Sequence, residues 1–175
     1  MTRRLVSAGL IAAGLIASAL SGQTPSERIS PDNAIRIQEF YRLAAQIEYQ
    51  VWAKWSLAPE PLLLVTATSE YLTHHPAPPS DFHAIGNGFY ARPRHFATNL
   101  LATFPAFGPP CVIVVGKPKN TSSKTSTPWL QTLMHEHFHQ LQNSQTNYFD
   151  HVRKLGLSRG DTTGMWMLNY PFPLR

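Results

Sequence analysis

The stretch of sequence that says most about this chain is TPWLQTLMHEHFHQLQNS, residues 127–144. Thr127 is a residue type that caps helix N-termini, and Pro128 suits the first helical position. The apolar residues that follow recur at helical spacing, so we predict a helix from Pro128 to about Ser144. One side of this helix is therefore expected to pack on a core, and the other to carry the polar residues.

Three residues near the middle of this helix can form a metal site: His135, Glu136 and His139. The two histidines are four residues apart, so their imidazoles project from one side of the helix, one turn apart. Two nitrogens at that spacing can bind one tetrahedral zinc ion. Glu136 lies about 100° further round the helix, where its carboxylate could take a proton from a zinc-bound water. The helical wheel predicts that all three point away from the apolar face.

Two other interpretations of this segment stay open. The polar face of the helix could simply be solvated. In a strand, His135, His137 and His139 would share one face and could bind a metal together. The cap signals and the helix-forming residues favour the helix.

The residues before this helix predict a second, longer helix near the N-terminus. Ser30-Pro31-Asp32 is a helix start, with Ser30 as the cap and Pro31 at the first helical position. Apolar residues then keep helical spacing, so we predict an amphipathic helix from Pro31 to about Ser56.

Apolar runs between the two helices, bounded by Pro and Gly, predict a small sheet. We expect strands at residues 62–68, 89–91 and 111–115, while residues 99–104 could form a helix or a strand. Gly86-Asn87-Gly88 predicts a turn. The expected fold class is α+β, with a long N-terminal helix, a small mixed sheet with an edge strand, and the helix at 128–144.

The first residues have the pattern of a secretory signal peptide. Arg3 and Arg4 precede an uncharged apolar stretch, and small residues at 17–19 suit a signal peptidase. We therefore predict a signal peptide over residues 1–22, a single domain over residues 23–175, and a secreted or periplasmic location. An uncleaved membrane anchor is the alternative, although the stretch is short for a transmembrane helix.

Charge and cysteine content argue against a nucleic-acid-binding protein and against a fold held by internal disulfides. The formal net charge is +5, but Lys and Arg form no run that would follow a phosphate backbone, so we expect no nucleic-acid partner. The single cysteine, Cys111, cannot form an internal disulfide. It opens the apolar run at 111–115, so we expect a buried side chain.

The His-Glu-x-x-His motif resembles that of the zincin metallopeptidases, whose active-site helix also follows an apolar strand. The resemblance covers residues 111 to about 144. It implies that His135 and His139 are zinc ligands and that Glu136 is the general base. It also implies that the strand at 111–115 edges a cleft and pairs with extended substrate. The implied function is an exported zinc-dependent hydrolase, a peptidase acting on a peptide or amide substrate.

Zincins use a third protein ligand, and here the sequence departs from their patterns. The metzincin position holds Gln145, and no glutamate follows Glu136 to supply the ligand of the gluzincin-like group. Asp161 is the first candidate, since the aspzincin group uses an aspartate, and His151 is the second. Alternatively, the chain is C-terminally truncated and the ligand lies in the missing part. It would then be a non-catalytic exported domain or one with a partial metal site.

Overall fold

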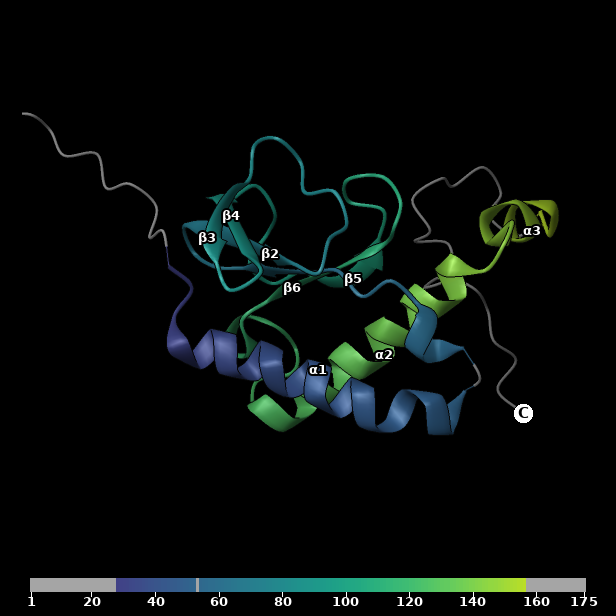
Figure 1. Ribbon diagram of the computed structural model, residues 1–175, viewed down its shortest axis with the longest axis horizontal. Coiled ribbons are helices and arrows are strands. Elements are labelled where there is room, and N and C mark those ends of the chain that lie inside the picture. The colour runs from purple at the N-terminus through teal and green to yellow at the C-terminus, as the bar shows by residue number, and fades with distance from the viewer. Residues whose placement is uncertain (1–27, 53, 157–175) are drawn as a thin grey trace, which may run out of the picture.

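The computed structural model describes residues 28–52 and 54–156 of the chain. These residues form a six-stranded mixed sheet with two long helices on one face and loops on the other (Figure 1). The predicted α+β class is therefore confirmed. The predicted signal peptide, residues 1–22, and Asp161 lie outside the described residues. Within the described ranges, no helix is long and apolar enough to cross a membrane.

The N-terminal helix, α1 (Pro31–Val51), begins where the sequence predicts it. It ends earlier than predicted, because the backbone of Trp52 is extended and a short 3₁₀ helix, Trp55–Leu57, follows. The buried positions of α1 recur every three or four residues and form one stripe that faces the sheet. They include Ile37, Phe40, Ala44 and Glu48.

The sheet has the strand order β3-β4-β2-β1-β6-β5. Its strands are β1 (Leu62–Val65), β2 (Ser69–Thr73), β3 (His83–Gly86), β4 (Phe89–Pro93), β5 (Leu101–Phe104) and β6 (Val112–Gly116). Only β1 and β6 pair in parallel; the other neighbours are antiparallel. The predicted edge strand at 111–115 is β6, which lies inside the sheet. The edge beside it is β5, the segment whose structure the sequence left open.

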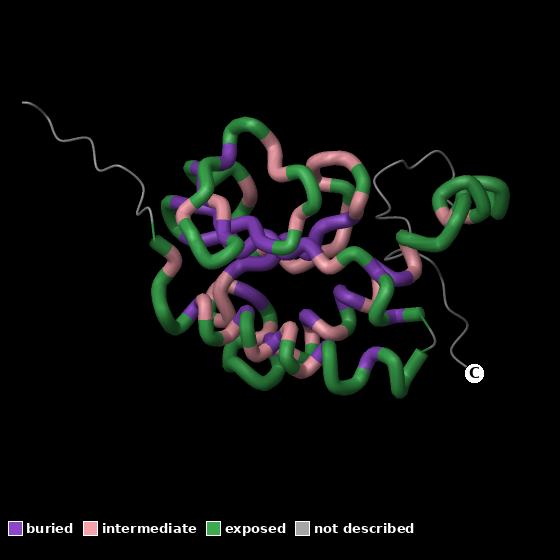
Figure 2. Tube along the Cα trace, in the orientation of Figure 1, coloured by how far each residue is buried: buried purple, intermediate pink, exposed green. Residues whose placement is uncertain are grey.

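The two central strands are apolar on both faces because both faces of the sheet are covered. Leu64 of β1 and Ile113 of β6 pack against α1 and the second long helix, at residues 126–144. Leu63 and Val114 pack under the loops. Figure 2 shows these buried strands between the helical layer and the loop layer. The continuous apolar runs that predicted the strands thus follow from burial on both sides.

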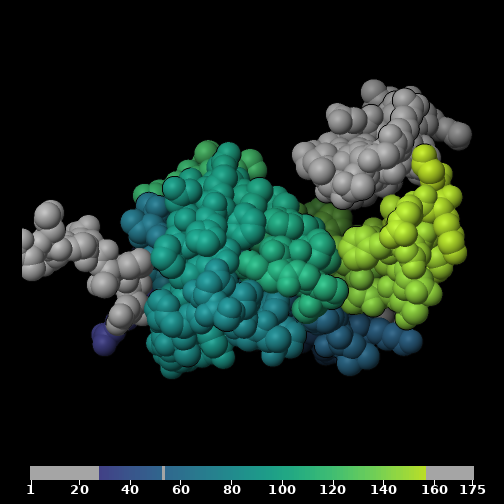
Figure 3. Space-filling model, turned by 90° about the horizontal axis from the view of Figure 1, so that it is seen from above, coloured from purple at the N-terminus to yellow at the C-terminus, as the bar shows by residue number. Residues whose placement is uncertain are grey.

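The second long helix, α2 (Ser126–Ser144), starts two residues before the predicted position, with Thr125 at its N-cap. Buried Trp129 donates a hydrogen bond of 2.9 Å from Nε1 to the carbonyl oxygen of Gly116, which fixes α2 to the end of β6. A short helix, α3 (Tyr148–Lys154), follows and projects to one side of the body (Figure 3). The sequence analysis did not predict α3.

The loop face is held by a buried ion pair that the sequence analysis also missed. Glu70 of β2 is 0% exposed, and its Oε2 accepts a bond of 2.8 Å from Nε of Arg92. Nη1 of Arg92 reaches Oδ2 of Asp81 at 2.7 Å, and its guanidinium lies 4.4 Å from the ring centre of Phe82. Strand β2 therefore carries a buried charge at its second residue, which a partner 22 residues later neutralises.

Candidate metal site

The three predicted residues of the metal site come together near the middle of α2. The Nε2 atoms of His135 and His139 are 3.0 Å apart, and their ring planes are perpendicular. One possible ligand atom from each of His135, Glu136 and His139 lies within 4.8 Å of the other two. His135 is exposed and His139 is half-buried. The group is therefore positioned to bind a metal ion that enters from solvent.

A neighbouring amide fixes how His139 presents its nitrogens. The amide oxygen of Gln142 lies 2.7 Å from Nδ1 of His139. An amide oxygen can only accept, so this contact favours the tautomer with its proton on Nδ1 and its lone pair on Nε2. Partners of this kind hold metal-binding histidines in one tautomer and one orientation. His139 is thus prepared to bind a metal through the nitrogen that faces His135.

The carboxylate of Glu136 lies at the margin of the buried face, and the prediction that it points away from that face is wrong. Glu136 is only 8% exposed, because the edge strand β5 covers it. The hydroxyl of Thr103 on β5 lies 2.8 Å from Oε2 of Glu136 and 3.0 Å from its carbonyl oxygen. The edge strand therefore orients the carboxylate and leaves Oε1 without a hydrogen-bond partner among the described residues.

The middle histidine of the motif, His137, points to the interior and is 1% exposed. Its Nε2 lies 3.0 Å from Oε2 of Glu48 on α1, and its Nδ1 lies 2.9 Å from Oε1 of Gln140. Both ring nitrogens thus face side-chain oxygens of buried neighbours. Because the segment is a helix, His137 and the His135–His139 pair are on opposite sides, which excludes the strand-like histidine triad.

Gln140 extends this buried network to the sheet. Its Nε2 donates to the carbonyl oxygen of Pro61 at 2.8 Å and to that of Cys111 at 3.1 Å. These two residues precede β1 and β6. The side of α2 opposite the metal site is therefore bonded to α1 and to two strand starts, which fixes the rotation of the helix about its axis.

The candidates for a further ligand do not join the group in the described residues. His151 is exposed on α3 and is not among the clustered ligand atoms. Gln145 ends α2, and its Nε2 donates to the carbonyl oxygen of Leu141 at 2.9 Å. Asp161 lies outside the described residues, so its role stays a prediction.

A cavity of about 370 Å³ opens one turn further along the polar side of α2. Asn143 lines it from α2, one turn beyond His139, and Phe149 lines it from α3. The rest of the lining is mostly proline: Pro59, Pro105, Pro109 and Pro110. The cavity is therefore largely apolar, with an amide at its helix side.

Cys111 also borders this cavity and is buried, as expected. Burial raises the pKa of its thiol, and a side-chain hydrogen bond with Asn143 opposes that increase in part. A raised pKa disfavours the thiolate, which is the nucleophilic form. Cys111 therefore acts as a wall of the cavity and not as an activated nucleophile.

The sequence analysis did not identify two residues that shape the site. Glu48 carried a usable signal, since it continues the buried stripe of Ile37, Phe40 and Ala44 and so places a carboxylate on an inward face. Thr103 carried none, because its contact with Glu136 spans 33 residues and depends on which strand forms the edge.

Comparisons with protein-family models, with curated proteins and with solved structures found no match for this chain.

Proposed function

We propose that this protein is an exported zinc-dependent hydrolase that cleaves a peptide or amide bond. The observation that carries the proposal is the group of His135, Glu136 and His139, with ligand atoms within 4.8 Å of one another on one helix. The resemblance to the zincin motif supports it, as does the predicted signal peptide for the location.

The donor set fits a zinc ion. Two nitrogens bound to a tetrahedral zinc at the usual lengths would be about 3.3 Å apart, and the Nε2 atoms of His135 and His139 are 3.0 Å apart. Imidazole nitrogens and a carboxylate are also ligand types that zinc prefers. A third ligand is still required, and Asp161 remains our first candidate for it.

Zinc at this group would lower the pKa of a bound water and polarise a substrate carbonyl. Glu136 would accept the proton of the attacking water. Thr103 engages Oε2 of this carboxylate, so Oε1 is the atom proposed to take the proton. Burial beside β5 keeps the carboxylate in one orientation, which is the requirement for a general base.

Strand β5 and the cavity beside Asn143 together form the proposed substrate-binding surface. Among the residues that the structure describes, strand β5 pairs only with β6, so the backbone groups on its outer side can bind an extended peptide. This strand runs into Pro105, a wall of the cavity beside Asn143. We therefore propose that substrate lies along β5, past Glu136, with an apolar side chain in the cavity.

The decisive test separates metal binding from catalysis. The full chain, prepared in zinc, should hold about one zinc ion per molecule, and the double variant His135→Ala/His139→Ala should hold none. Glu136→Gln should keep the zinc and lose nearly all hydrolysis of a quenched-fluorescence peptide library. Turnover that survives Glu136→Gln would contradict the general-base role.

One observation favours a second candidate, a non-catalytic exported domain with a partial metal site. In the part of the chain that the structure describes, no further metal-binding side chain joins His135, Glu136 and His139. This candidate predicts weak zinc binding and no turnover of any library peptide. Zinc bound at about one per chain together with Glu136-dependent turnover excludes it.

A further inference from the structure

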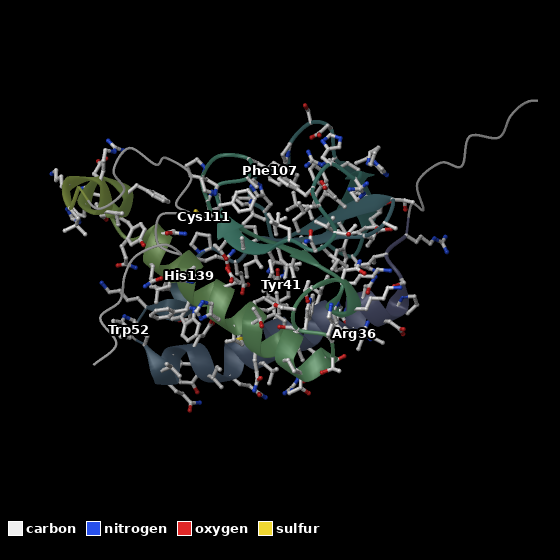
Figure 4. All side chains as sticks on the ribbon, turned by 180° about the vertical axis from the view of Figure 1, so that it is seen from behind. Arg36, Tyr41, Trp52, Phe107, Cys111 and His139 are labelled. Carbon is white, nitrogen blue, oxygen red and sulfur yellow. The ribbon has the colours of Figure 1, made fainter. Side chains whose placement is uncertain are left out.

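A second hollow, of about 430 Å³, lies between the first turns of α1 and α2 and the segment after β6. Arg36, which lines it, lies toward the opposite end of the molecule from His139 and Cys111 (Figure 4). The hollow is therefore separate from the metal group and from the cavity beside it.

Positive charge dominates the lining of this hollow. Four cationic side chains, Arg36, Lys117, Lys119 and Lys124, face one carboxylate, that of Asp32. Among the described residues, none of the four forms an ion pair. Cations gathered in a concave surface without counter-charges raise the local concentration of anions.

The same hollow receives the positive ends of two helices. Neither Ser30 at the start of α1 nor Thr125 at the start of α2 forms a side-chain cap. The backbone N–H groups of Ser126 and Thr127 have no acceptor among the described residues. Open first-turn N–H groups and the helix dipole together favour a bound oxyanion.

One side chain in the lining points independently to a ligand. Asn33 is 5% exposed, yet its carboxamide has no hydrogen-bond partner in the part of the chain that the structure describes. Its amide atoms are not among the fully enclosed unpartnered atoms of the described residues, so they are open to the hollow and to a partner there. An acceptor oxygen in the hollow would supply it. Arg36 is also held in place, since its Nε donates to the hydroxyl of Ser126 at 3.0 Å.

We propose that this hollow binds a phosphate dianion, either free or as the phosphomonoester of a small molecule. A tetrahedral oxyanion has acceptors for Asn33, for the first turn of α2 and for Nη2 of Arg36, whose Nε and Nη1 already bond to Ser126 and Asp32. The mobile charges of Lys117 and Lys124 would neutralise it. The hollow exceeds the size of one phosphate ion, so it has room for the group to which the phosphate is esterified.

The test is a titration of the full chain at constant ionic strength, in EDTA and with a His135→Ala/His139→Ala background so that phosphate cannot bind through a metal. Inorganic phosphate, phenyl phosphate and sodium chloride are the three titrants. We expect saturable shifts of the backbone amide NMR signals of Asn33, Ser126 and Thr127 with either phosphate and not with chloride. Tighter binding of phenyl phosphate than of inorganic phosphate would identify an esterified ligand, and the reverse would identify the free ion.

Variants then locate the binding. Lys117→Ala/Lys124→Ala and Asn33→Asp should each weaken phosphate binding about tenfold or more, since hydrogen bonds to a charged ligand are lost or a repelling charge is added. Lys154→Ala, on exposed α3, is the matched control and should change affinity less than about twofold. The proposal is overturned if these amides show no saturable shift up to about 20 mM phosphate, or if Lys154→Ala weakens binding as much as the lysine pair. Circular dichroism confirms that each variant is folded.

Discussion

Replacing both Glu48 and His137 by leucine should destabilise the fold less than the sum of the two single replacements. Nε2 of His137 and Oε2 of Glu48 are 3.0 Å apart, and the side chains are 1% and 12% exposed. Removing one partner from a buried hydrogen-bonded pair leaves the polar group of the other without a partner. Replacing both residues removes the pair and leaves neither side chain as a buried polar group without its partner.

The magnitudes follow from the contacts of each residue. Glu48→Leu leaves Nε2 of buried His137 without a hydrogen-bond partner and should cost about 3 kcal/mol. His137→Leu leaves a carboxylate that can partly rehydrate and an unpaired Oε1 on Gln140, at about 2 kcal/mol. In the double variant only the Gln140 oxygen and some packing are lost, so we expect about 2 kcal/mol instead of 5.

The assay is urea unfolding of the metal-free chain at pH 7, followed by circular dichroism, with EDTA present so that metal binding does not contribute. Glu39→Leu, an exposed position on the same helix, is the control and should change stability by less than about 0.5 kcal/mol. If the double variant costs the sum of the single variants within about 0.5 kcal/mol, the pair is not coupled and our account of the network is wrong.

Two further predictions concern the edge strand and the loop face. Thr103→Val removes the hydroxyl that orients Glu136 at nearly constant volume, so peptide hydrolysis should fall about tenfold with unchanged zinc content; unchanged steady-state kinetics would show that the contact is not needed. The hydrogen bond from Arg92 lowers the pKa of Asp81 below its usual 3.8, so its stabilisation is present above that value and is lost as pH falls through the folded-state pKa. Stability measured from pH 6 to pH 2 should therefore fall less in Asp81→Asn than in the parent, and equal slopes would contradict this.

The sequence was sufficient for the local features of the fold. Helices α1 and α2 and the turn at Gly86-Asn87-Gly88 were predictable, because apolar spacing and positive-φ residues act over short distances. Pro31 is at the first helical position of α1 as predicted, whereas Pro128 is the third residue of α2. The presence of β6 was predictable for the same reason. Its place inside the sheet was not, since that depends on pairing with β1 and β5, far along the chain.

The same division holds for the site. The spacing of His135 and His139 placed two possible ligands on one side of a helix without any knowledge of the fold. The burial of Glu136 depended on Thr103, and the inward role of His137 on Glu48, contacts that span 33 and 89 residues. Strand β2 was missed because a glutamate such as Glu70 indicates an exposed position. Its burial depends on Arg92, which the sequence does not place beside it.

The alternation of histidines in α2 has a consequence for how the helix finds its orientation. His135, His137 and His139 place imidazoles on both sides of the helix, so one polar ring belongs to the buried side. Only the interior offers acceptors that suit one ring, from Glu48 and from the amide of Gln140. A slip of α2 by one residue would turn it by about 100° and separate His137 from both. The hydrogen bonds on the buried side thus select one rotation of the helix about its axis. That rotation sets the direction in which the metal ligands point.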